Sequence, residues 1–437
     1  MTFATLVRRN LTYFWRTNVA VVAGVGVAVA VLAGALLVGA SVRGSLHELA
    51  LLRLGSVDQV VTSGGFFREA LADDLRSATD LAATFGDVCP LIILEGFVTH
   101  QETGRRASGV QVYGVDERFW RFHGSDPSGR APDTNDVLLS GGLARELGGQ
   151  AGDALLVRVE KPSAIPVGSL HGRKGDVGRT VRLSIRAVVS ADELGEFSVR
   201  PQQGLARAVF VSLERLQEDL ERPGRVNTIL LGVGASTDDN AARAALVEAS
   251  LRERVTLEDL GIKLRTLPAP GALSTGLIIM EADAGLLSDE VAGAGRSAAE
   301  ALGMRAQPIL TYLANRIRLG DRAVPYSLLT ALDLDTITPV PSSQFPVPSS
   351  QPPIVLNEWA ADDLAATPGD LVTIEYYQWQ DEGRLLTREA EFRVAGVVPL
   401  EGAAADPDLV LDYPGITQAG SLFEWDPPFL IDLSLVG

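Results

Sequence analysis

An uncharged apolar run close to the N-terminus dominates the hydrophobic pattern of this chain. It extends from Thr17 to Val42, between Arg16 and Arg43, and is rich in valine, alanine and glycine. As an α-helix the run measures roughly 39 Å at about 1.5 Å per residue, enough to cross a hydrocarbon core of about 30 Å with some tilt. The pattern therefore predicts a transmembrane helix at residues 17–42.

A cleaved signal peptide is the competing interpretation of this run. The tripeptide Val38–Ala40 would supply the small residues of a cleavage site. The apolar core of a secretory signal usually spans about 7–15 residues, however, and this run is clearly longer. We therefore favour an uncleaved anchor, and under either interpretation the body of the chain is exported.

The residues before the apolar run predict an amphipathic segment. Apolar and aromatic positions interleave with basic ones, and no acidic residue interrupts them: Phe3, Leu6, Val7, Arg8, Arg9, Leu11, Phe14, Trp15 and Arg16. Arginines beside a span favour the cytoplasmic side, and aromatic rings favour the headgroup level. We therefore predict that residues 1–16 lie at the cytoplasmic face of a bacterial inner membrane, with the body outside the cytoplasm.

After Val42 the pattern changes to short β-type runs that alternate with helical ones, which is typical of an α+β or mixed α/β body. No later run reaches about 18 uncharged apolar residues, so the pattern predicts a single span. The expected elements are a strand at Ser56–Ser63, a helix at Phe66–Ala78, strands at Pro90–His100, Ala107–Val115 and Val226–Val233, a strand entering a helix at Arg207–Leu216, and helices at Ala241–Arg252, Ser288–Leu302 and Ile309–Arg318.

An internal repeat is the most informative feature of the body. Val137–Val157 and Ile354–Ile374 align without gaps, and a β-type run follows each, at Val181–Val189 and Glu391–Val398. The aligned pairs include Leu139/Leu356, Ser140/Asn357, Ala144/Ala361, Leu147/Leu364, Gly152/Gly369 and Asp153/Asp370. This pattern indicates a short strand, a helix capped by Ser or Asn, a Gly-Asp turn and an antiparallel β unit. We therefore predict two related small β-rich modules.

These observations divide the chain into six regions. We predict a cytoplasmic amphipathic basic segment at 1–16, the transmembrane helix at 17–42, a first extracytoplasmic domain at 43–235 with its β module at 137–189, a helical or mixed segment at 236–337, a Pro/Ser linker at 338–353, and the second β module with the C-terminal tail at 354–437. The linker prediction depends on the tandem PVPSSQF and PVPSSQP sequences, whose composition favours extended structure.

Charge and cysteine content exclude several classes of protein. The formal net charge is −17, and the first sixteen residues are basic, so the acidic excess lies in the body. A body this acidic repels a phosphate backbone, which argues against nucleic-acid binding. The single cysteine, Cys89, permits no disulfide within one chain, and its β-type surroundings indicate a core residue rather than a nucleophile.

A search for catalytic and cofactor motifs finds none. The sequence lacks a Walker A loop, a G-x-S-x-G elbow, an H-E-x-x-H motif and a Cys/His cluster. Acidic pairs such as Asp73-Asp74, Asp192-Glu193 and Asp362-Asp363 lack the spacing of a calcium loop. The histidines, at positions 47, 100, 123 and 171, share no motif, and we expect each to be exposed or locally hydrogen-bonded. We predict no catalytic, cofactor-binding or metal-binding residues, and no enzyme activity.

After the basic start and the span, several segments follow in a definite order, namely Gln111–Asp116, Gly129-Arg130, Val137–Asp153, the β run to Val189, Ala208–Gln217 and Val226–Leu231. This order resembles the beginning of a permease of the FtsX/MacB type of ABC transporter. The second module and Thr311–Asp321 resemble longer variants of this family.

The resemblance implies a permease subunit that works with a separate cytoplasmic ABC ATPase. The strokes of that ATPase would move the extracytoplasmic domain and support mechanotransmission, export of envelope substrates or lipoprotein release. The implied partners are the ATPase subunit, membrane lipids and a second permease copy. Arg8, Arg9 and the amphipathic start would lie near the ATPase or the membrane surface.

The chain departs from the family in its number of spans. Members have four or more transmembrane helices, including a C-terminal set, whereas this sequence shows one. We therefore expect either the N-terminal part of a longer permease or a subunit whose other spans lie on another chain, and no transport by this chain alone. The alternatives are a single-span envelope protein that binds or scaffolds partners and an exported enzyme with an unfamiliar site.

Overall fold

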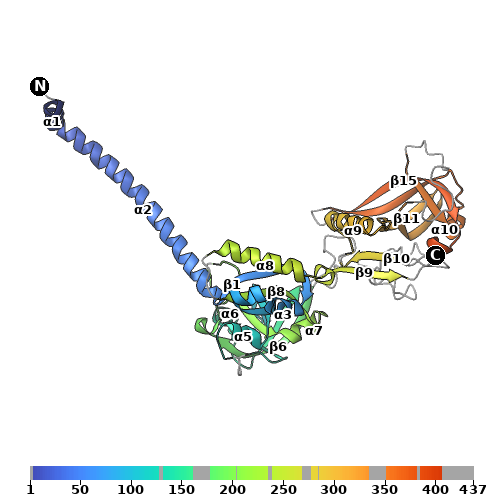
Figure 1. Cartoon of the computed structure of the whole chain (residues 1–437), viewed down its shortest axis with the longest axis horizontal. Coiled ribbons are helices and arrows are strands. Elements are labelled where there is room, and N and C mark those ends of the chain that lie inside the picture. The colour runs from blue at the N-terminus through green and yellow to red at the C-terminus, as the bar shows by residue number, and fades with distance from the viewer. Residues whose placement is uncertain are drawn as a thin grey trace.

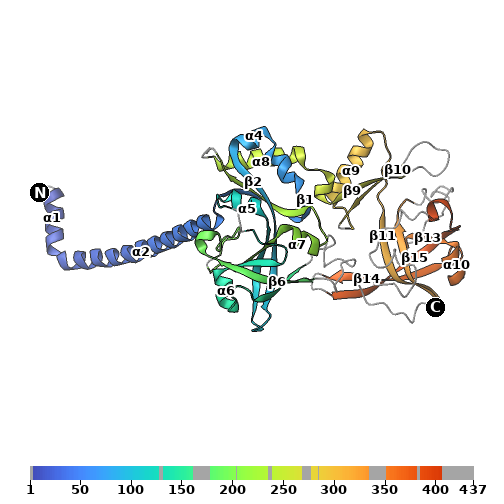
Figure 2. The ribbon, with the colours of Figure 1, turned by 90° about the horizontal axis from the view of Figure 1, so that it is seen from below.

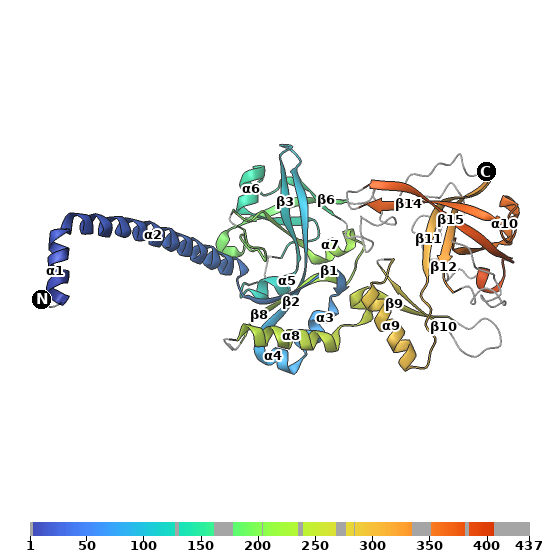
Figure 3. The ribbon, with the colours of Figure 1, turned by 90° about the horizontal axis from the view of Figure 1, so that it is seen from above.

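The computed structural model describes residues 3–126, 131–160, 178–202, 204–234, 239–267, 277–283, 285–333, 351–380 and 384–405. Two helices at the N-terminus project away from a first β-rich body, and two further sheets lie beyond that body (Figure 1). The views from below and above show the same order along the molecule (Figures 2 and 3). The fold is mixed α/β with one long apolar helix before a sheet-rich body, as the sequence predicts.

The N-terminal helices are α1 (Phe3–Tyr13) and α2 (Trp15–Leu54). Helix α2 includes the whole uncharged run and continues past it to Leu54. Its apolar side chains are exposed along the run, and among the described residues it is the one helix long and apolar enough to cross a membrane. A lipid environment explains this exposure, because a continuous apolar surface of this size is unfavourable in water.

The first body contains an eight-stranded sheet in the order β1-β8-β2-β3-β7-β4-β6-β5. Its strands are β1 (Val57–Arg68), β2 (Phe85–His100), β3 (Arg106–Val115), β4 (Asp136–Ser140), β5 (Ala154–Glu160), β6 (Gly178–Val189), β7 (Ala208–Ser212) and β8 (Arg225–Val233). The long strand β2 also pairs with β5, so six of the strands close a ring. Closure leaves these strands without a free edge.

Both faces of this sheet are buried. The helices and turns of the first body are α3 (Ala70–Arg76), α4 (Thr79–Thr84), α5 (Glu117–Phe122), α6 (Gly141–Leu147), α7 (Leu213–Asp219), α8 (Asn240–Arg254) and the 3₁₀ turns Ala191–Glu193 and η2 (Leu257–Leu260). An aliphatic cluster fills one side, and an aromatic cluster with Phe119, Trp120 and Phe210 fills the other. Cys89 lies fully buried in the aromatic cluster, which confirms its prediction as a core residue.

The predicted helix at Phe66–Ala78 is wrong in its first residues. Phe67 and Arg68 belong to β1, where they pair with Val226 and Arg225 of β8, and α3 begins at Ala70. Phe67 is buried in the aliphatic cluster. Strand pairing and burial of this aromatic ring therefore outweigh the local helical pattern.

Two smaller sheets follow. Strands β9 (Ile262–Leu267) and β10 (Leu277–Ala282) form a hairpin beside α9 (Asp289–Ala301). The other sheet has five strands in the order β12-β11-β14-β15-β13. Its elements are β11 (Leu310–Leu319), β12 (Arg322–Ala331), β13 (Pro353–Asn357), α10 (Glu358–Leu364), β14 (Leu371–Gln380) and β15 (Arg384–Val398), followed by the 3₁₀ turn Gly402–Ala405.

The predicted helix at Ile309–Arg318 is wrong, because this segment is strand β11. It pairs with β12 along nearly its whole length and with β14 at Arg316, Ile317 and Arg318. Alternate side chains, at Thr311, Leu313, Asn315 and Ile317, are buried. Gly320 forms the β11–β12 turn with a φ of +59°. The two-residue alternation of a half-buried strand is the correct period here.

The two predicted modules adopt the same arrangement. In each module, a short strand leads into a helix whose N-terminus is capped by a side chain. A Gly-Asp turn follows the helix and leads into a pair of antiparallel strands, β5–β6 or β14–β15. Ser140 accepts a hydrogen bond from the Leu143 N–H, and Asn357 accepts one from the Ala360 N–H. The first strand pairs in parallel with the last in both modules, with an irregularity at the same step. The repeat is therefore structural as well as sequential.

Some sequence predictions lie outside the described residues. They are the Gly129-Arg130 pair, His171, most of the predicted linker at 338–353, and the tail at 406–437. Pro353, the last linker residue, is the first residue of β13.

Candidate functional site at the base of the long helix

A network of buried polar contacts lies where helix α2 enters the first body. Arg53, in the last turn of α2, is the one buried residue of this helix. Its side chain is 7% exposed and forms an ion pair with Glu196, 3.0 Å between Nη2 and Oε2. A buried guanidinium requires several acceptors to offset the loss of water.

Those acceptors come from the loop between β6 and β7. Arg53 Nη1 donates to the Gln202 carbonyl at 2.7 Å, and Nη2 donates to the Gly204 carbonyl at 2.7 Å. Glu196 also accepts from the Ala206 N–H at 2.8 Å, and the Ser198 N–H donates to the Arg53 carbonyl. The loop therefore encloses the last turn of α2 through both side-chain and backbone contacts.

The next residues form a second contact around His123. Gly55 directly follows the last residue of α2. Its φ of +60° favours glycine, and a Cβ there would lie 2.7 Å from His123 Nδ1. The Ser56 N–H donates to this Nδ1 at 3.2 Å. His123 packs edge-on against Phe119, Phe122 and Phe197. This contact ties the exit of the helix to the aromatic cluster.

Burial among these rings lowers the pKa of His123 to about 4. The imidazole is therefore neutral at physiological pH, and Nδ1 is the unprotonated acceptor that the Ser56 N–H requires. We name the Arg53 contacts together with His123, Gly55 and Ser56 the helix-base site.

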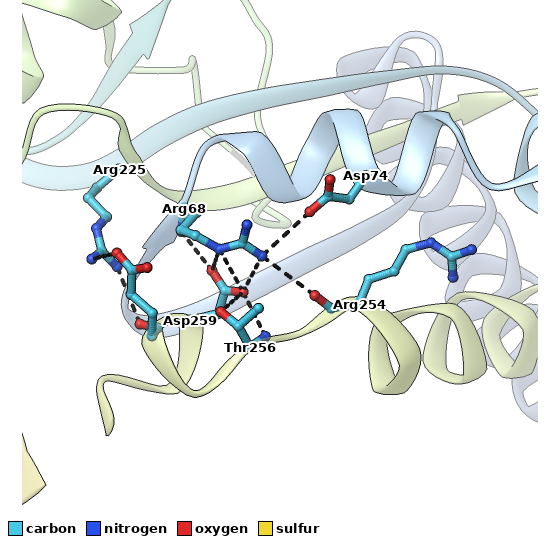
Figure 4. Close-up of polar contacts among 7 residues, drawn as sticks. Arg68, Asp74, Arg225, Arg254, Thr256 and Asp259 are labelled. Atoms are coloured by element: carbon cyan, nitrogen blue, oxygen red, sulfur yellow. Dashed lines mark hydrogen bonds and ion pairs between the residues drawn. The ribbon is translucent and has the colours of Figure 1, made fainter. Parts of the chain in front are cut away.

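A second polar network lies where the chain leaves the first body (Figure 4). Arg68, at the end of β1, binds both carboxylate oxygens of Asp259 in the 3₁₀ turn η2, with 3.0 Å from Nε and 2.8 Å from Nη2. The Arg68 N–H donates to the same carboxylate. Asp259 also accepts from the backbone and hydroxyl of Thr256, at 2.9 and 3.0 Å. We name these residues the exit site.

The electrostatics of the exit site favour its charged form. Burial would raise the pKa of the Asp259 carboxyl, but hydrogen bonds from Arg68 and Thr256 outweigh burial and leave the pKa below its ordinary value. The hydrogen bond to Asp259 raises the pKa of Arg68. Arg68 also reaches Asp74 and the Arg254 carbonyl, while Arg225 binds Glu258 beside it (Figure 4). The turn that leads into β9 is thus fixed to the first body.

The acidic pairs and histidines that the sequence offers as candidates for catalysis or metal binding do not form one site among the described residues. Asp73 pairs with Arg76, Asp74 with Arg68, and Glu193 caps the 3₁₀ turn after Ser190. His100 is buried. Its Nδ1 accepts from the nearby Thr103 N–H at 3.1 Å, and its Nε2 lies 3.1 Å from the Asp153 carboxylate, whereas His47 is exposed. Within the part of the chain that the structure describes, no three His, Cys, Asp or Glu side chains group as metal ligands do.

Sequence reasoning did not find the helix-base or exit sites. The partners of Arg53 lie 143 to 151 residues further along the chain, and Asp259 lies 191 residues from Arg68. The local sequence offers one signal, Arg53 two positions before Gly55, and a basic residue followed by glycine is common at helix ends. The sites can therefore be recognised only once the tertiary fold is known.

Comparison with known proteins places most of α2 and most of the first body in one family. The family described as MacB-like periplasmic core domain matches residues 19–249, more than half of the chain. No curated protein sequence matches the chain.

Two solved structures are similar to part of the chain. One is the periplasmic region of MacB from Actinobacillus actinomycetemcomitans, with 10% sequence identity, coverage of 47% of this chain and 89% of that one, and a TM-score of 0.29. The other is the extracellular domain of the noncanonic ABC-type transporter YknZ from Gram-positive bacteria, with 8% identity, coverage of 50% and 97%, and a TM-score of 0.27.

Proposed function

This chain belongs to the family with a MacB-like periplasmic core domain, and from that premise we propose that it is the membrane-anchored permease subunit of an ABC transporter, or the N-terminal part of one. In this proposal a cytoplasmic ATPase drives the subunit, and the extracytoplasmic body transmits the motion to a substrate in the envelope. Export of an envelope substrate or release of a lipoprotein is the resulting activity.

The helix-base site is the observation that carries this proposal. Helix α2 is continuous from Trp15 to Leu54, roughly 60 Å at about 1.5 Å per residue. An uninterrupted helix is stiff, and its last turn is fixed to the body by Arg53 and the contacts around His123. A displacement of α2 at the membrane therefore moves the first body instead of being absorbed by a flexible linker.

The exit site extends the same argument to the rest of the chain. The buried Asp259 carboxylate holds the turn before β9 against β1 and α3 through Arg68. Motion of the first body is thereby passed to the segment that leads to the second module. Each site joins elements that are distant in sequence. One site lies where the chain enters the first body and the other where it leaves, and a body that transmits motion requires rigid connections at these two places.

The cytoplasmic end of the chain supplies the contact with the ATPase in this proposal. Helix α1 turns away from α2 (Figures 2 and 3). Arg8 and Arg9 are exposed in α1, as are its apolar side chains. Such a helix suits the headgroup region of the inner membrane, with the N-terminus in the cytoplasm. Membrane lipids, the ATPase and a second permease copy are the proposed partners.

Affinity purification of the full chain from membranes of its host tests the proposal. We expect an ATPase subunit with a Walker A motif to co-purify at a constant ratio, together with ATP hydrolysis. Reversal of charge in α1, Arg8→Glu with Arg9→Glu, should remove that subunit. Arg305→Glu, an exposed change in the extracytoplasmic body, is the matched control and should leave it bound.

Recovery of intact chain without any ATPase subunit would contradict the proposal. In that case the chain would be a single-span envelope protein that binds or scaffolds partners. The same purification therefore distinguishes the two functions.

A further inference from the structure

Helices α1 and α2 meet at a fixed corner. Phe14 separates them with φ −98° and ψ 26°, outside the α-helical region. The Phe14 N–H donates to the Asn10 carbonyl and the Asn18 N–H donates to the Phe14 carbonyl, each at 3.0 Å. Backbone hydrogen bonds therefore hold both sides of the corner, and α1 runs across the direction of α2 (Figures 2 and 3). With α2 across the membrane, as in the proposed function, α1 lies along the cytoplasmic membrane surface.

A hollow of about 650 Å³ lies beside α1 at this corner. Leu6, Arg9 and Tyr13 line it, and their spacing of three to four residues places them on one side of the helix. Asn10, Thr12 and Phe14 complete the lining. The hollow thus combines N–H and O–H donors with apolar and aromatic walls, which suits a ligand with one polar end and one apolar end.

The hollow lies on the border between the two faces of α1. Phe3, Val7 and Leu11 share an exposed apolar face, and Thr5 and Arg8 lie opposite. At about 3.6 residues per turn, the side that lines the hollow falls between these faces. A helix on a membrane surface buries its apolar face as far as the boundary between headgroups and acyl chains. The border of that face, and with it the hollow, is therefore at the level of the lipid phosphates.

The charge around the hollow favours an anion. Arg8, Arg9 and Arg16 are exposed, and the sequence has no acidic residue before Glu48. A guanidinium binds a phosphate through two N–H groups, and an amide or a phenolic hydroxyl can donate to further oxygens. A zwitterionic lipid carries an ammonium group that this positive surface repels. The charges therefore favour an anionic phospholipid.

We propose that the hollow at the α1–α2 corner binds the headgroup of an anionic phospholipid of the cytoplasmic leaflet, such as phosphatidylglycerol. Arg9 pairs with the phosphate, and Asn10 and Tyr13 donate to headgroup oxygens. Leu6 and Phe14 contact the glycerol and the upper acyl chains. The bound lipid stabilises the corner and thereby the orientation of α1. The inference rests on the membrane placement of α1 in the proposed function and does not require the ATPase.

Native mass spectrometry of the purified full chain, without any ATPase, tests the site. The chain in detergent is mixed with equal amounts of phosphatidylglycerol and phosphatidylcholine. We expect about tenfold more phosphatidylglycerol than phosphatidylcholine to be retained, and Arg9→Gln to remove most of this preference, because it loses a charge-assisted contact. Arg43→Gln is the matched control and should retain the preference, because Arg43 is exposed at the other end of the same apolar run.

Further arms separate binding in the hollow from general attraction by charge. Arg8→Gln makes the same change of charge on the polar face of α1 and should retain most of the preference. Tyr13→Phe should lower it about threefold, through loss of one hydroxyl donor. Millimolar inorganic phosphate should not displace the lipid, because it has no acyl chains to contact Leu6 and Phe14.

Equal retention of the two lipids by the unaltered chain would overturn the proposal. Equal losses in Arg9→Gln and in Arg8→Gln or Arg43→Gln would also overturn it, because the lipid would then follow net charge and not the hollow. Displacement by inorganic phosphate would assign the hollow to a free anion, with the same consequence. Because the assay contains no ATPase, its failure leaves the co-purification test intact, and failure of that test leaves this result unchanged.

Discussion

Gly152 and Gly369 hold the same place in the two modules and have almost the same backbone. Their φ angles are +97° and +101°. The Gly152 N–H donates to the Ile185 carbonyl and the Gly369 N–H to the Val394 carbonyl, each at 2.7 Å. The duplication therefore extends to individual hydrogen bonds, and this turn fixes the register of the strand that follows it.

Replacing either glycine should destabilise its own module. Nothing lies within 4 Å of a Cβ added at Gly152 or Gly369, so the cost of alanine arises from the positive φ alone. We expect Gly152→Ala and Gly369→Ala each to lower the local free energy of unfolding by about 1–2 kcal/mol. Hydrogen–deuterium exchange of β5–β6 and β14–β15 in the full chain measures this loss.

Gly293→Ala is the matched control for both variants. Gly293 lies in α9, has a negative φ and has open space around it. Alanine there should be neutral or stabilising by up to about 1 kcal/mol, because it favours the helix. Equal exchange in all three variants would show that the Gly-Asp turn does not stabilise the modules.

The repeat shows why part of this fold could be predicted from sequence. Its signals are local, since a cap residue, a Gly-Asp turn and alternating apolar positions each act within a few residues. The apolar run of α2 is equally local, because its length and composition alone meet the requirement of a membrane.

The failures share a physical cause. Ile309–Arg318 carries apolar residues at spacings that suit a helix as well as a strand, and only its pairing with β12 and β14 decides the period. The local pattern around Phe67 favours a helix, because its strand partner Val226 is distant in sequence and gives no local signal. The helix-base and exit sites are further examples, because the main partners of Arg53 and Arg68 lie more than 140 residues away in the sequence.

Removal of Arg53 should release the helix from the body. Arg53→Met leaves the Glu196 carboxylate, 19% exposed, without its cation, and we expect a loss of about 3 kcal/mol. Exchange of the Glu196–Ala206 loop should rise accordingly. Arg43→Met, an exposed change on the same helix, should leave the loop unchanged. A loop equally protected in both variants would show that Arg53 does not hold the helix.

His123 should make the stability of the first body depend on pH. Its pKa falls from 6.5 to about 4 on folding because of burial, so the unfolded chain takes up the proton first. The contribution of neutral His123 is therefore complete above pH 6.5 and is lost as the pH falls from 6.5 towards 4. We expect roughly 2 kcal/mol less stability at pH 5 than at pH 8.

Chemical unfolding of the full chain at these two pH values measures the effect. His123→Gln, which retains an acceptor for the Ser56 N–H but does not titrate, should remove most of the difference. His47→Gln, on the exposed surface of α2, should retain it. An unchanged pH dependence in His123→Gln would assign the effect to other groups.

The exit site should lose stability when its buried carboxylate is neutralised. Asp259→Asn removes the ion pair with Arg68 and leaves the 2%-exposed position with one fewer acceptor, so we expect about 3 kcal/mol of local destabilisation. Because the pKa of Asp259 is lowered on folding, its contribution is present above the ordinary carboxyl pKa of about 4 and is lost below it. Exchange of η2 and β9 at neutral pH measures the loss.

Glu258→Gln breaks the neighbouring pair with Arg225, but Glu258 is 58% exposed, so its cost should stay below about 1 kcal/mol. If the two variants loosen the turn equally, burial of Asp259 is not what joins the first body to β9.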